Sequence, residues 1–327
     1  MQFDIVVPTR GNISHLKTLL ACIEKQSLRP QRIIFVVNQY HWSLLQLQWE
    51  VSKDVSDALY DCIDWHIISA DDPMSGNASF ARNVWCSLAL SDYVYFIDDD
   101  NQFWPDFFTR TVAEYLSLRQ EYKSELLYSP TIMRRDTERV QSQWIKAYHY
   151  IAGRPEPVIF GWWKSKLVSK LRPLFALPSF YKNRADYVIA STIWGNSLFS
   201  KRSLFQTYPF DVRMAFVYED IDMAYRITKH GIPLIISKKL HINHMERTKN
   251  SLEQSFLANA STAFQKSKNR ILFVKKNGAL WQKIIFFVIW LPITTVLTCV
   301  FVVVRGWKKS LSLLSSYCKG IYAWLVQ

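Results

Sequence analysis

The chain has 327 residues, of which 49% are hydrophobic and 15% aromatic, so it can form one large α/β domain with an appendage or two ordinary domains, and it is not mainly disordered. The formal net charge is +13, but the last acidic residue is Glu253, and the first 253 residues carry 30 basic against 27 acidic groups. The basic character therefore belongs to the C-terminal tail, which argues against a nucleic-acid-binding protein.

The first hundred residues alternate short β-branched runs with amphipathic stretches, the pattern of βα units that feed a mostly parallel sheet. The runs are 3–7, 33–37, 65–68 and 93–97. After the first run, leucines and an isoleucine recur at helical spacing and predict a helix with one buried face, with Ser14 as its N-cap. A second helix is predicted over 79–90.

The second half of the chain is less regular at its start. Residues 119–186 combine tryptophans with prolines, so loops and short helices over the sheet are expected there. A helix over 218–230 is predicted to end at Gly231 in the C′ position, followed by a strand over 232–236.

The tail contains 21 consecutive uncharged residues, 284–304, with Pro292 near the middle. A membrane-crossing helix needs about 20 apolar residues. After this run, apolar residues recur at alternating spacings of four and three over 307–325, which predicts an interfacial amphipathic helix. Three arrangements of the uncharged run stay open: one tilted membrane helix, a hairpin with both ends on one side, or a buried helical pair in a soluble domain.

Several features indicate where the protein resides. The five cysteines form no CxxC pair, which favours a reducing compartment. The strand-like start leaves no room for a cleavable signal peptide. Basic residues beside an apolar segment attract anionic lipid by about 1 kcal/mol each. We therefore expect the protein on the cytoplasmic face of an inner membrane, bound through its C-terminal helices to an anionic surface.

Three consecutive carboxylates, Asp98, Asp99 and Asp100, follow the apolar run 93–97. Ligands of open α/β sheets bind at the carboxyl ends of strands. In an extended segment Asp98 and Asp100 would point to the same side, where one could hold a divalent cation and the other a ribose hydroxyl. The alternative is an acidic turn that caps the next helix.

Two more segments accompany the acidic triplet. Pro8-Thr9-Arg10-Gly11-Asn12 follows the first strand, and the sequence GNASFARN, residues 76–83, opens the helix before the acidic strand. The order of these segments resembles the nucleotide-binding half of the inverting family 2 glycosyltransferases with the GT-A fold, such as rhamnosyltransferase-like and other cell-surface polysaccharide enzymes.

That resemblance implies a set of donor-nucleotide contacts: Pro8, Thr9, Arg10, Asn38, Arg82, Asp98 and Asp99. It also implies that Asp100 holds a divalent cation, Mn²⁺ or Mg²⁺, which bridges the diphosphate. The chain departs from the family pattern at Asn38, where an Asp usually contacts the pyrimidine. The amide oxygen of Asn38 can still accept a hydrogen bond, but the identity of the base is left open.

The acceptor side has its own motifs. The sequence WGNS, residues 194–197, precedes VYEDID, residues 217–222. These resemble the acceptor loop and the Glu-Asp element of the family, which implies acceptor contacts by Trp194, Gly195 and Asn196, a general base at Asp220 and a supporting carboxylate at Glu219. An inverting transfer needs one carboxylate to take the proton of the acceptor hydroxyl.

Other uses of these acidic residues also fit the sequence. Acids in a first turn commonly complement the helix N-terminus. Asp222 and Arg226, at i and i+4, are expected to form a supporting ion pair. The family often has a histidine that completes metal or diphosphate binding after the next strand; we expect His244 in this role, with His241 as the second choice, although both also fit ordinary core or surface positions.

The sequence thus predicts an α/β GT-A fold whose mostly parallel sheet is flanked by helices, plus membrane-associated C-terminal helices. The expected parts are a nucleotide-sugar-binding half (1–118), an acceptor-binding half (119–275) and a basic tail (276–327). The expected activity is transfer of a hexose or deoxyhexose from a nucleoside-diphosphate sugar to a saccharide or lipid-linked acceptor in cell-surface polysaccharide or lipopolysaccharide synthesis. No Gln-x-x-Arg-Trp element follows the base, so transfer is expected to be non-processive. The alternative is a membrane-associated, non-catalytic binding or scaffold protein with this fold.

Overall fold

The protein is described by a computed structural model that covers residues 1–38, 44–134, 181–191, 193, 197–245, 260–292, 295–296 and 307–325. Most of the region expected to form loops over the sheet, 135–180, lies outside these residues, as do Trp194, Gly195 and Asn196.

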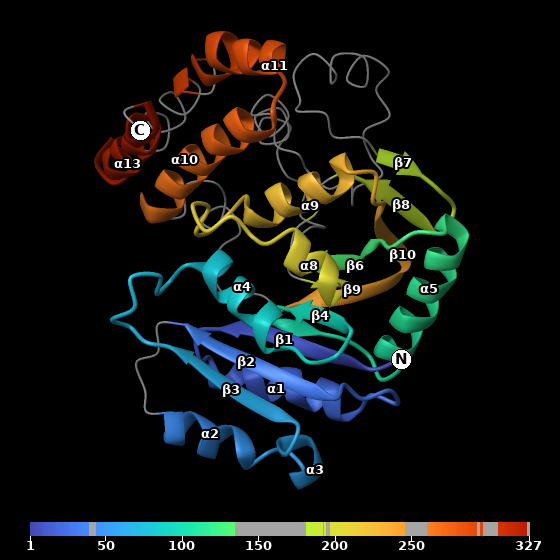
Figure 1. Ribbon diagram of the computed structural model, residues 1–327. Coiled ribbons are helices and arrows are strands. Elements are labelled where there is room, and N and C mark those ends of the chain that lie inside the picture. The colour runs from blue at the N-terminus through green and yellow to red at the C-terminus, as the bar shows by residue number, and fades with distance from the viewer. Residues whose placement is uncertain are drawn as a thin grey trace.

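Within the described residues, one ten-stranded sheet runs through the molecule (Figure 1). Its first four strands are all parallel: β3 (Ile63–Ile68), β2 (Arg32–Asn38), β1 (Phe3–Thr9) and β4 (Tyr93–Ile97). Each lies within two residues of its predicted position, because β-branched runs flanked by turn residues are a strong local signal.

The other strands form a mixed continuation of the sheet. In order from β4 they are β9 (Ser197–Lys201), β6 (Leu127–Arg134), β10 (Leu234–His244), β8 (Tyr187–Ala190) and β7 (Tyr181–Asn183), and the short β5 (Asn101–Gln102) pairs with the end of β10. Strand β9 is antiparallel to β4, whereas β6 and β10 are parallel to each other. The sheet is therefore mixed, with its parallel part on the N-terminal side.

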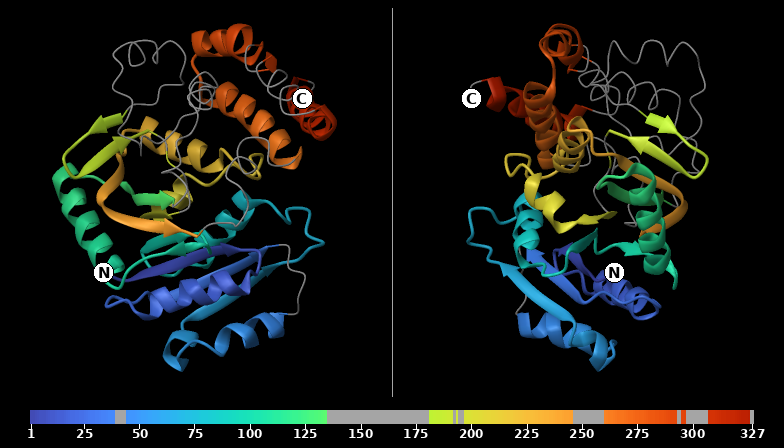
Figure 2. Two further views of the ribbon diagram at one scale, coloured as in Figure 1. Left: turned by 180° about the vertical axis from the view of Figure 1, so that it is seen from behind. Right: turned by 45° about the vertical axis from the view of Figure 1, so that its right-hand side comes forward.

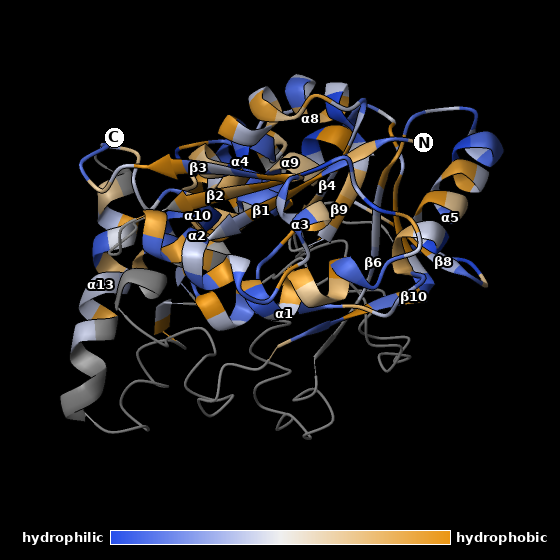
Figure 3. Ribbon diagram, turned by 90° about the horizontal axis from the view of Figure 1, so that it is seen from below, coloured by the Kyte–Doolittle hydropathy of each residue, from blue (hydrophilic) through white to orange (hydrophobic). Residues whose placement is uncertain are grey.

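Helices cover both faces of the sheet. Along β1, Ile5 and Val7 face one core and Val6 faces the other, as strand geometry requires. The first core is covered by α1 (Ile13–Glu24), α2 (Leu44–Ser52) and α5 (Phe107–Tyr122), next to the short α3 (Asp57–Tyr60). The second is covered by α4 (Ala78–Leu88), α8 (Arg202–Thr207) and α9 (Glu219–Lys229). Figure 3 shows the apolar strands β1, β2 and β4 beside helices that carry both apolar and polar residues.

Two local predictions differ from the structure. Helix α1 begins two residues earlier than expected, because the side chain of Asn12, not Ser14, accepts a hydrogen bond from the His15 N–H at 3.3 Å and caps the helix. Strand β10 is longer than predicted and contains the histidines expected to follow it, since the strand continues through a register shift between Ile236 and His241. Gly231 does end α9, with φ of +82°.

The tail forms a helical layer on the far side of α9 from β3 and α2 (Figure 2). It comprises α10 (Ala260–Asn277), α11 (Leu280–Ile285), the π-helical segment η2 (Phe286–Trp290) and α13 (Trp307–Leu325). Helix α13 forms where it was predicted; among its described side chains Tyr317 is buried, while Cys318, expected on the apolar face, is exposed.

The described part of the tail contains no helix that is both long and apolar enough to cross a membrane. Much of the uncharged run, residues 293–294 and 297–304, lies outside the described residues. The predicted division of the chain at 118/119 falls inside α5, and that at 275/276 falls inside α10.

Candidate functional site

The strand order has a switch point between β1 and β4. The order runs 3-2-1 and then reverses to 4, and this switch point is where open α/β sheets bind ligands. Thr9 ends β1, and its hydroxyl donates a hydrogen bond to Asp99 Oδ2 at 2.6 Å. His15, in the first turn of α1, lies 3.8 Å from the other oxygen of Asp99. His15 was not among the predicted site residues, although its place just after the loop that follows the first strand was a signal for it.

The acidic triplet forms a turn and not the expected extended segment. The Asn101 N–H donates to the carbonyl of Asp98 at 3.3 Å, which closes the turn. The three carboxylates therefore have different neighbours. Asp98 lies near Arg82, Asp99 accepts a hydrogen bond from Thr9, and Asp100 lies near His244.

The pairing of β5 with β10 brings Asp100 and His244 together. His244 lies opposite Asn101 in the register, and its Nε2 is 3.3 Å from Asp100 Oδ2. Asp100 is 4% exposed, and its Oδ1 is buried without a hydrogen-bond partner among the described residues. The second candidate, His241, instead packs edge-on against Trp104 with ring centroids 4.1 Å apart.

Arg82 connects the acidic turn to the start of α9. Its Nη1 donates to Glu219 Oε1 at 2.5 Å, and its Nη2 is 3.7 Å from Asp98 Oδ1. Burial alone would lower the pKa of Arg82, but the charges of Glu219, Asp98 and Asp220 outweigh it and raise that pKa. For Asp98, burial and the neighbouring carboxylates outweigh the attraction of Arg82 and raise the pKa to about 7. A cation bound near this cluster would favour the ionised form of Asp98.

The carboxylates of Glu219 and Asp220 lie in the first turn of α9. Glu219 is buried and Asp220 is partly buried, with the Ile221 N–H donating to Asp220 Oδ1 at 2.7 Å. Just before them, Val217 and Tyr218 adopt positive φ angles of 68° and 77°. The backbone therefore turns sharply where the two carboxylates begin.

Helix α4 holds the loop that leads to this turn, which we call the base loop, residues 209–218. Asn77 Nδ2 donates to Val212 O at 2.8 Å, and Ser79 Oγ donates to Met214 O at 2.6 Å. Asn83 exchanges two 2.8 Å hydrogen bonds with the backbone of Phe210. The GNASFARN motif was predicted to contact the nucleotide through Arg82; Asn77, Ser79 and Asn83 of this motif hold the base loop.

Asp222 forms the predicted ion pair with Arg226, with Nε to Oδ2 at 2.8 Å. The carboxylate is fully buried and makes two further contacts with the tail. Lys276 Nζ lies 2.8 Å from Oδ2, and Asn277 Nδ2 donates to Oδ1 at 2.8 Å. Asp222 therefore ties α9 to α10.

Other predicted contacts are less defined. Pro8 is partly buried at the end of β1 and Arg10 is exposed just after it. Asn38 ends β2, paired with Ile68 of β3, and its side chain lies outside the description. The acceptor residues Trp194, Gly195 and Asn196 also lie outside the described residues.

A divalent cation at Asp100 and His244 would need further ligands besides these two side chains. No cluster of three or more His, Cys, Asp or Glu side chains with metal-binding geometry occurs in the described residues. Asp100 and His244 nevertheless offer an unpartnered buried oxygen and an imidazole nitrogen at one point. Cations that bind together with substrate phosphates often take only one or two protein ligands, so the pair fits such a cation.

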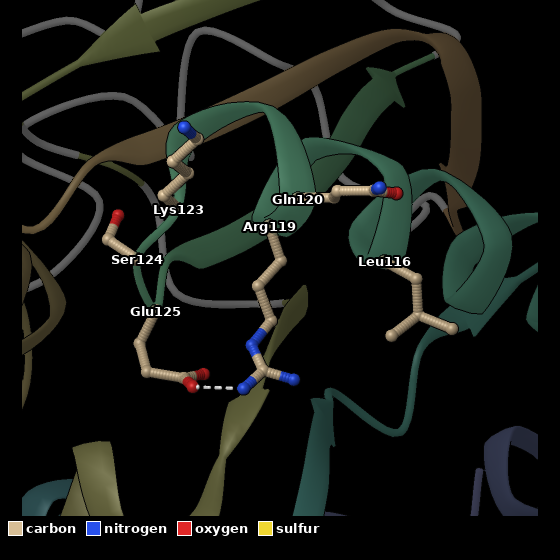
Figure 4. Close-up of a pocket in the computed structure, with 6 residues that line it drawn as sticks. All are labelled: Leu116, Arg119, Gln120, Lys123, Ser124 and Glu125. Carbon is tan, nitrogen blue, oxygen red and sulfur yellow. Dashed lines mark ion pairs between the residues drawn. The ribbon is translucent and has the colours of Figure 1, made fainter.

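A separate shallow pocket of about 330 Å³ lies at the C-terminal end of α5 (Figure 4). Arg119 and Glu125 form a 2.7 Å ion pair across it. Arg119 also donates to the hydroxyl of Tyr93, at the amino end of β4. The pocket thus lies at the opposite end of β4 from the acidic turn.

Solved structures share this arrangement of strands and helices. A crystal structure of GalNAc-T7 with UDP, GalNAc and Mn²⁺ matches with a TM-score of 0.56 and 12% identity, over 84% of this chain and 48% of that one. The fold is GT-A-like. This confirms the predicted mixed α/β class with a central, mostly parallel sheet.

Weaker matches include two structures of S. aureus TarS. One has a TM-score of 0.48 and 10% identity over 85% of this chain and 67% of that one. The other, in complex with UDP-GlcNAc, has a TM-score of 0.47 and 12% identity, over 85% of this chain and 68% of that one. No family model matches the sequence, and no curated protein does.

Proposed function

We propose that the protein is a glycosyltransferase that moves a sugar, with inversion, from a nucleoside-diphosphate donor to a saccharide hydroxyl. The observation that carries this proposal is that two clusters of carboxylates come together at the switch point. The acidic turn supplies Asp98 and Asp100, the first turn of α9 supplies Glu219 and Asp220, and Arg82 lies between them.

The donor side and the acceptor side divide the chemistry. Thr9, Arg82 and the acidic turn surround the position proposed for the nucleotide and its diphosphate. Asp220 accepts the proton of the acceptor hydroxyl as that oxygen forms its bond to the anomeric carbon. The bond from the anomeric carbon to the diphosphate oxygen breaks on the opposite face, and the diphosphate leaves with the electron pair. Arg82, held by Glu219, keeps a positive charge close to the departing group.

Asp100 and His244 would hold a divalent cation, Mn²⁺ or Mg²⁺. When bound, such a cation supplies positive charge to the diphosphate oxygens. The buried, unpartnered Oδ1 of Asp100 supports this assignment, because a buried carboxylate oxygen without a donor is costly unless a cation or ligand satisfies it.

Calorimetric titration with UDP, dTDP and GDP, each with and without Mn²⁺, tests the donor site. UDP with Mn²⁺ is the first pair to try, since GalNAc-T7 was solved with both. We expect cation-dependent binding of one nucleotide that is lost in Asp100→Ala and kept in Asp92→Ala, an exposed position at the opposite end of β4. If no nucleotide binds in any condition, the glycosyltransferase proposal is wrong and the non-catalytic scaffold takes its place.

The general base is tested separately. Asp220→Asn keeps the size of the side chain and removes its basicity, so transfer should fall by about 10²- to 10⁴-fold while nucleotide affinity stays within error. The anomeric configuration of the product, read by NMR, tests inversion. Undiminished transfer by Asp220→Asn would remove this residue from the mechanism.

We further propose that the acceptor is lipid-linked and that the enzyme acts on the cytoplasmic face of an anionic membrane, adding one or a few hexose or deoxyhexose units in cell-surface polysaccharide synthesis. Four apolar side chains of the tail support a membrane contact, each at least 54% exposed: Leu280, Ile284, Val288 and Val296. The first three follow one another at i+4 spacing along α11 and η2, and Lys283 lies among them. Exposed apolar rows with basic neighbours are typical of membrane-surface segments.

Co-sedimentation with vesicles tests this contact. We expect binding to phosphatidylglycerol vesicles, weaker binding to phosphatidylcholine, and loss of both in the triple variant Leu280→Ser, Ile284→Ser, Val288→Ser. The control Leu116→Ser removes an exposed leucine of α5 and should bind like the wild type. Equal recovery of wild type and triple variant in the vesicle pellet would contradict the proposed membrane face. Protease protection in inverted and right-side-out membrane vesicles assigns the face.

A further inference from the structure

The base loop ends in a strained turn. Val217 has φ of 68°, and a β-branched residue rarely adopts this left-handed region because its side chain crowds the backbone. Tyr218 follows with φ of 77°. Such a conformation persists only where surrounding contacts hold it, and here it directly precedes Glu219 and Asp220.

One side chain of α10 donates hydrogen bonds to two consecutive carbonyls at the start of this turn. Asn269, in α10, is fully buried, and its Nδ2 donates to Phe216 O at 2.9 Å and to Val217 O at 2.8 Å. Both amide hydrogens are thereby used on consecutive carbonyls of the base loop. An amide with two donors is suited to this geometry, whereas a hydroxyl could satisfy only one of the two carbonyls.

Apolar packing from the same helix surrounds the turn. Phe273, one helical turn after Asn269, packs against Tyr218 and Tyr225, with ring centroids at 6.0 Å and 5.5 Å. Leu272 and Met214 belong to the same cluster. The base loop is therefore held between two helices, with α4 bonding its first part and α10 its last.

We propose that Asn269 is a positioning residue for the general base, which it holds through the backbone of the base loop. The inference rests on the proposed glycosyltransferase function and on Asp220 as its base. Without the two hydrogen bonds, the turn at Val217 and Tyr218 relaxes toward negative φ, and the carboxylate of Asp220 moves away from the acceptor hydroxyl. The nucleotide site at β1 and β4 does not touch Asn269 and keeps its geometry.

The test compares Asn269→Ala and the isosteric Asn269→Asp, which has no donor for the two carbonyls, with Ser267→Ala. Ser267 is a matched control because it is buried on the same helix but bonds Tyr317 O of α13 rather than the base loop. We expect both Asn269 variants to lower kcat about 10- to 100-fold, the scale of a misplaced catalytic group, with the donor KM unchanged. Ser267→Ala should keep the kcat of the wild type.

A second measurement separates positioning from general destabilisation. Hydrogen exchange should increase at the amides of residues 216–220 in Asn269→Ala, while strands β1 and β4 stay protected and the nucleotide-binding stoichiometry stays at the wild-type value. A structural role alone would lower kcat and stoichiometry together. In addition, Val217→Gly accepts positive φ without strain, so it should reduce the loss of kcat that Asn269→Ala causes.

The outcomes distinguish the two proposals. If the wild type transfers no sugar from any nucleotide donor, the proposed function fails, and hydrogen exchange alone decides whether Asn269 holds the turn. If the wild type is active and Asn269→Ala keeps its kcat and its exchange pattern, the positioning inference is overturned while the function stands.

Discussion

The two sides of the candidate site are built in different ways. On the donor side, Thr9 and the acidic turn follow directly from the ends of two adjacent parallel strands, β1 and β4. On the base side, the first turn of α9 depends on helices that come from distant parts of the sequence, α4 and α10. The donor side is therefore a property of the sheet, whereas the base side is an assembly of side-chain hydrogen bonds.

This difference predicts different sensitivities. The ends of paired inner strands are supported by many backbone hydrogen bonds. Replacing a single side chain there should change the local geometry without unfolding the strands. A loop held by a few buried side chains loses its conformation when one of them is removed. Arg82 is the point where the two sides meet, since it contacts both Asp98 and Glu219.

Removing the link at Arg82 should have the largest effect. Arg82→Met leaves the buried carboxylate of Glu219 without its cation, and such a loss costs about 3 to 5 kcal/mol of the free energy of unfolding. Donor affinity should fall as well. Urea unfolding and nucleotide titration measure the two effects.

The control for that experiment is Lys53→Met. Lys53, just after α2, forms a surface ion pair with Glu50 of α2. Losing this pair should lower the free energy of unfolding by less than about 1 kcal/mol. If Arg82→Met lowered the free energy of unfolding no more than this control, Arg82 would not couple the donor side to the base side.

The second prediction concerns the helix that supports the base side. A Cβ on Gly320 of α13 would lie 2.6 Å from Phe264 O of α10 and also collide with Ser267 Oγ. We expect Gly320→Ala to push α13 away from α10, at a cost of about 2 kcal/mol. Hydrogen exchange of residues 307–325 reports the separation. The exposed Ser315→Ala on the same helix should leave exchange unchanged, and equal protection in both variants would contradict the close approach.

The third prediction tests the donor side alone. Thr9→Val removes the hydrogen bond to Asp99 while keeping the shape of the side chain. We expect the free energy of unfolding to fall by about 1.5 kcal/mol and the nucleotide affinity to become several-fold weaker. Thr9→Ser keeps the hydroxyl and should restore the affinity. A Thr9→Ser variant as weak as Thr9→Val would show that the methyl group, not the hydrogen bond, matters.

The same contrast explains what could be predicted from the sequence. The four parallel strands and the position of the acidic triplet follow from local patterns, because apolar β-branched runs and their flanking residues specify both. The turn within the triplet was not predictable, since it depends on the pairing of β5 with β10, more than 130 residues apart in the chain.

The base side was recognised only through its Glu-Asp element. Asn77, Asn83 and Asn269 carry no motif that marks them as loop supports, because an asparagine at a helix start or on a helix surface usually serves as a cap or a solvent contact. Their partners are backbone carbonyls of a loop, which any sequence supplies. Such contacts become visible only when the helices are packed.

The last and smallest effect concerns pH and the base loop. Burial opposes the ionisation of Asp211, but hydrogen bonds from Arg213 and Lys276 outweigh it and hold the pKa of Asp211 below its usual range. A depressed pKa stabilises the fold at pH values above the unfolded-state pKa, and the contribution is lost as pH falls through the folded-state pKa. Because Lys276 belongs to α10, this loss loosens the base loop from the tail.

We therefore expect the free energy of unfolding to decrease from about pH 5 to about pH 2, and Asp211→Asn to flatten this decrease by about 1 kcal/mol. Urea unfolding at a series of pH values measures it. The control Asp186→Asn removes an exposed pair with Lys239 at the far edge of the sheet and should leave the slope nearly unchanged. An equal flattening by both variants would mean that acid acts on the surface in general, whereas flattening by Asp211→Asn alone would make the contact between base loop and tail the acid-sensitive side of the site.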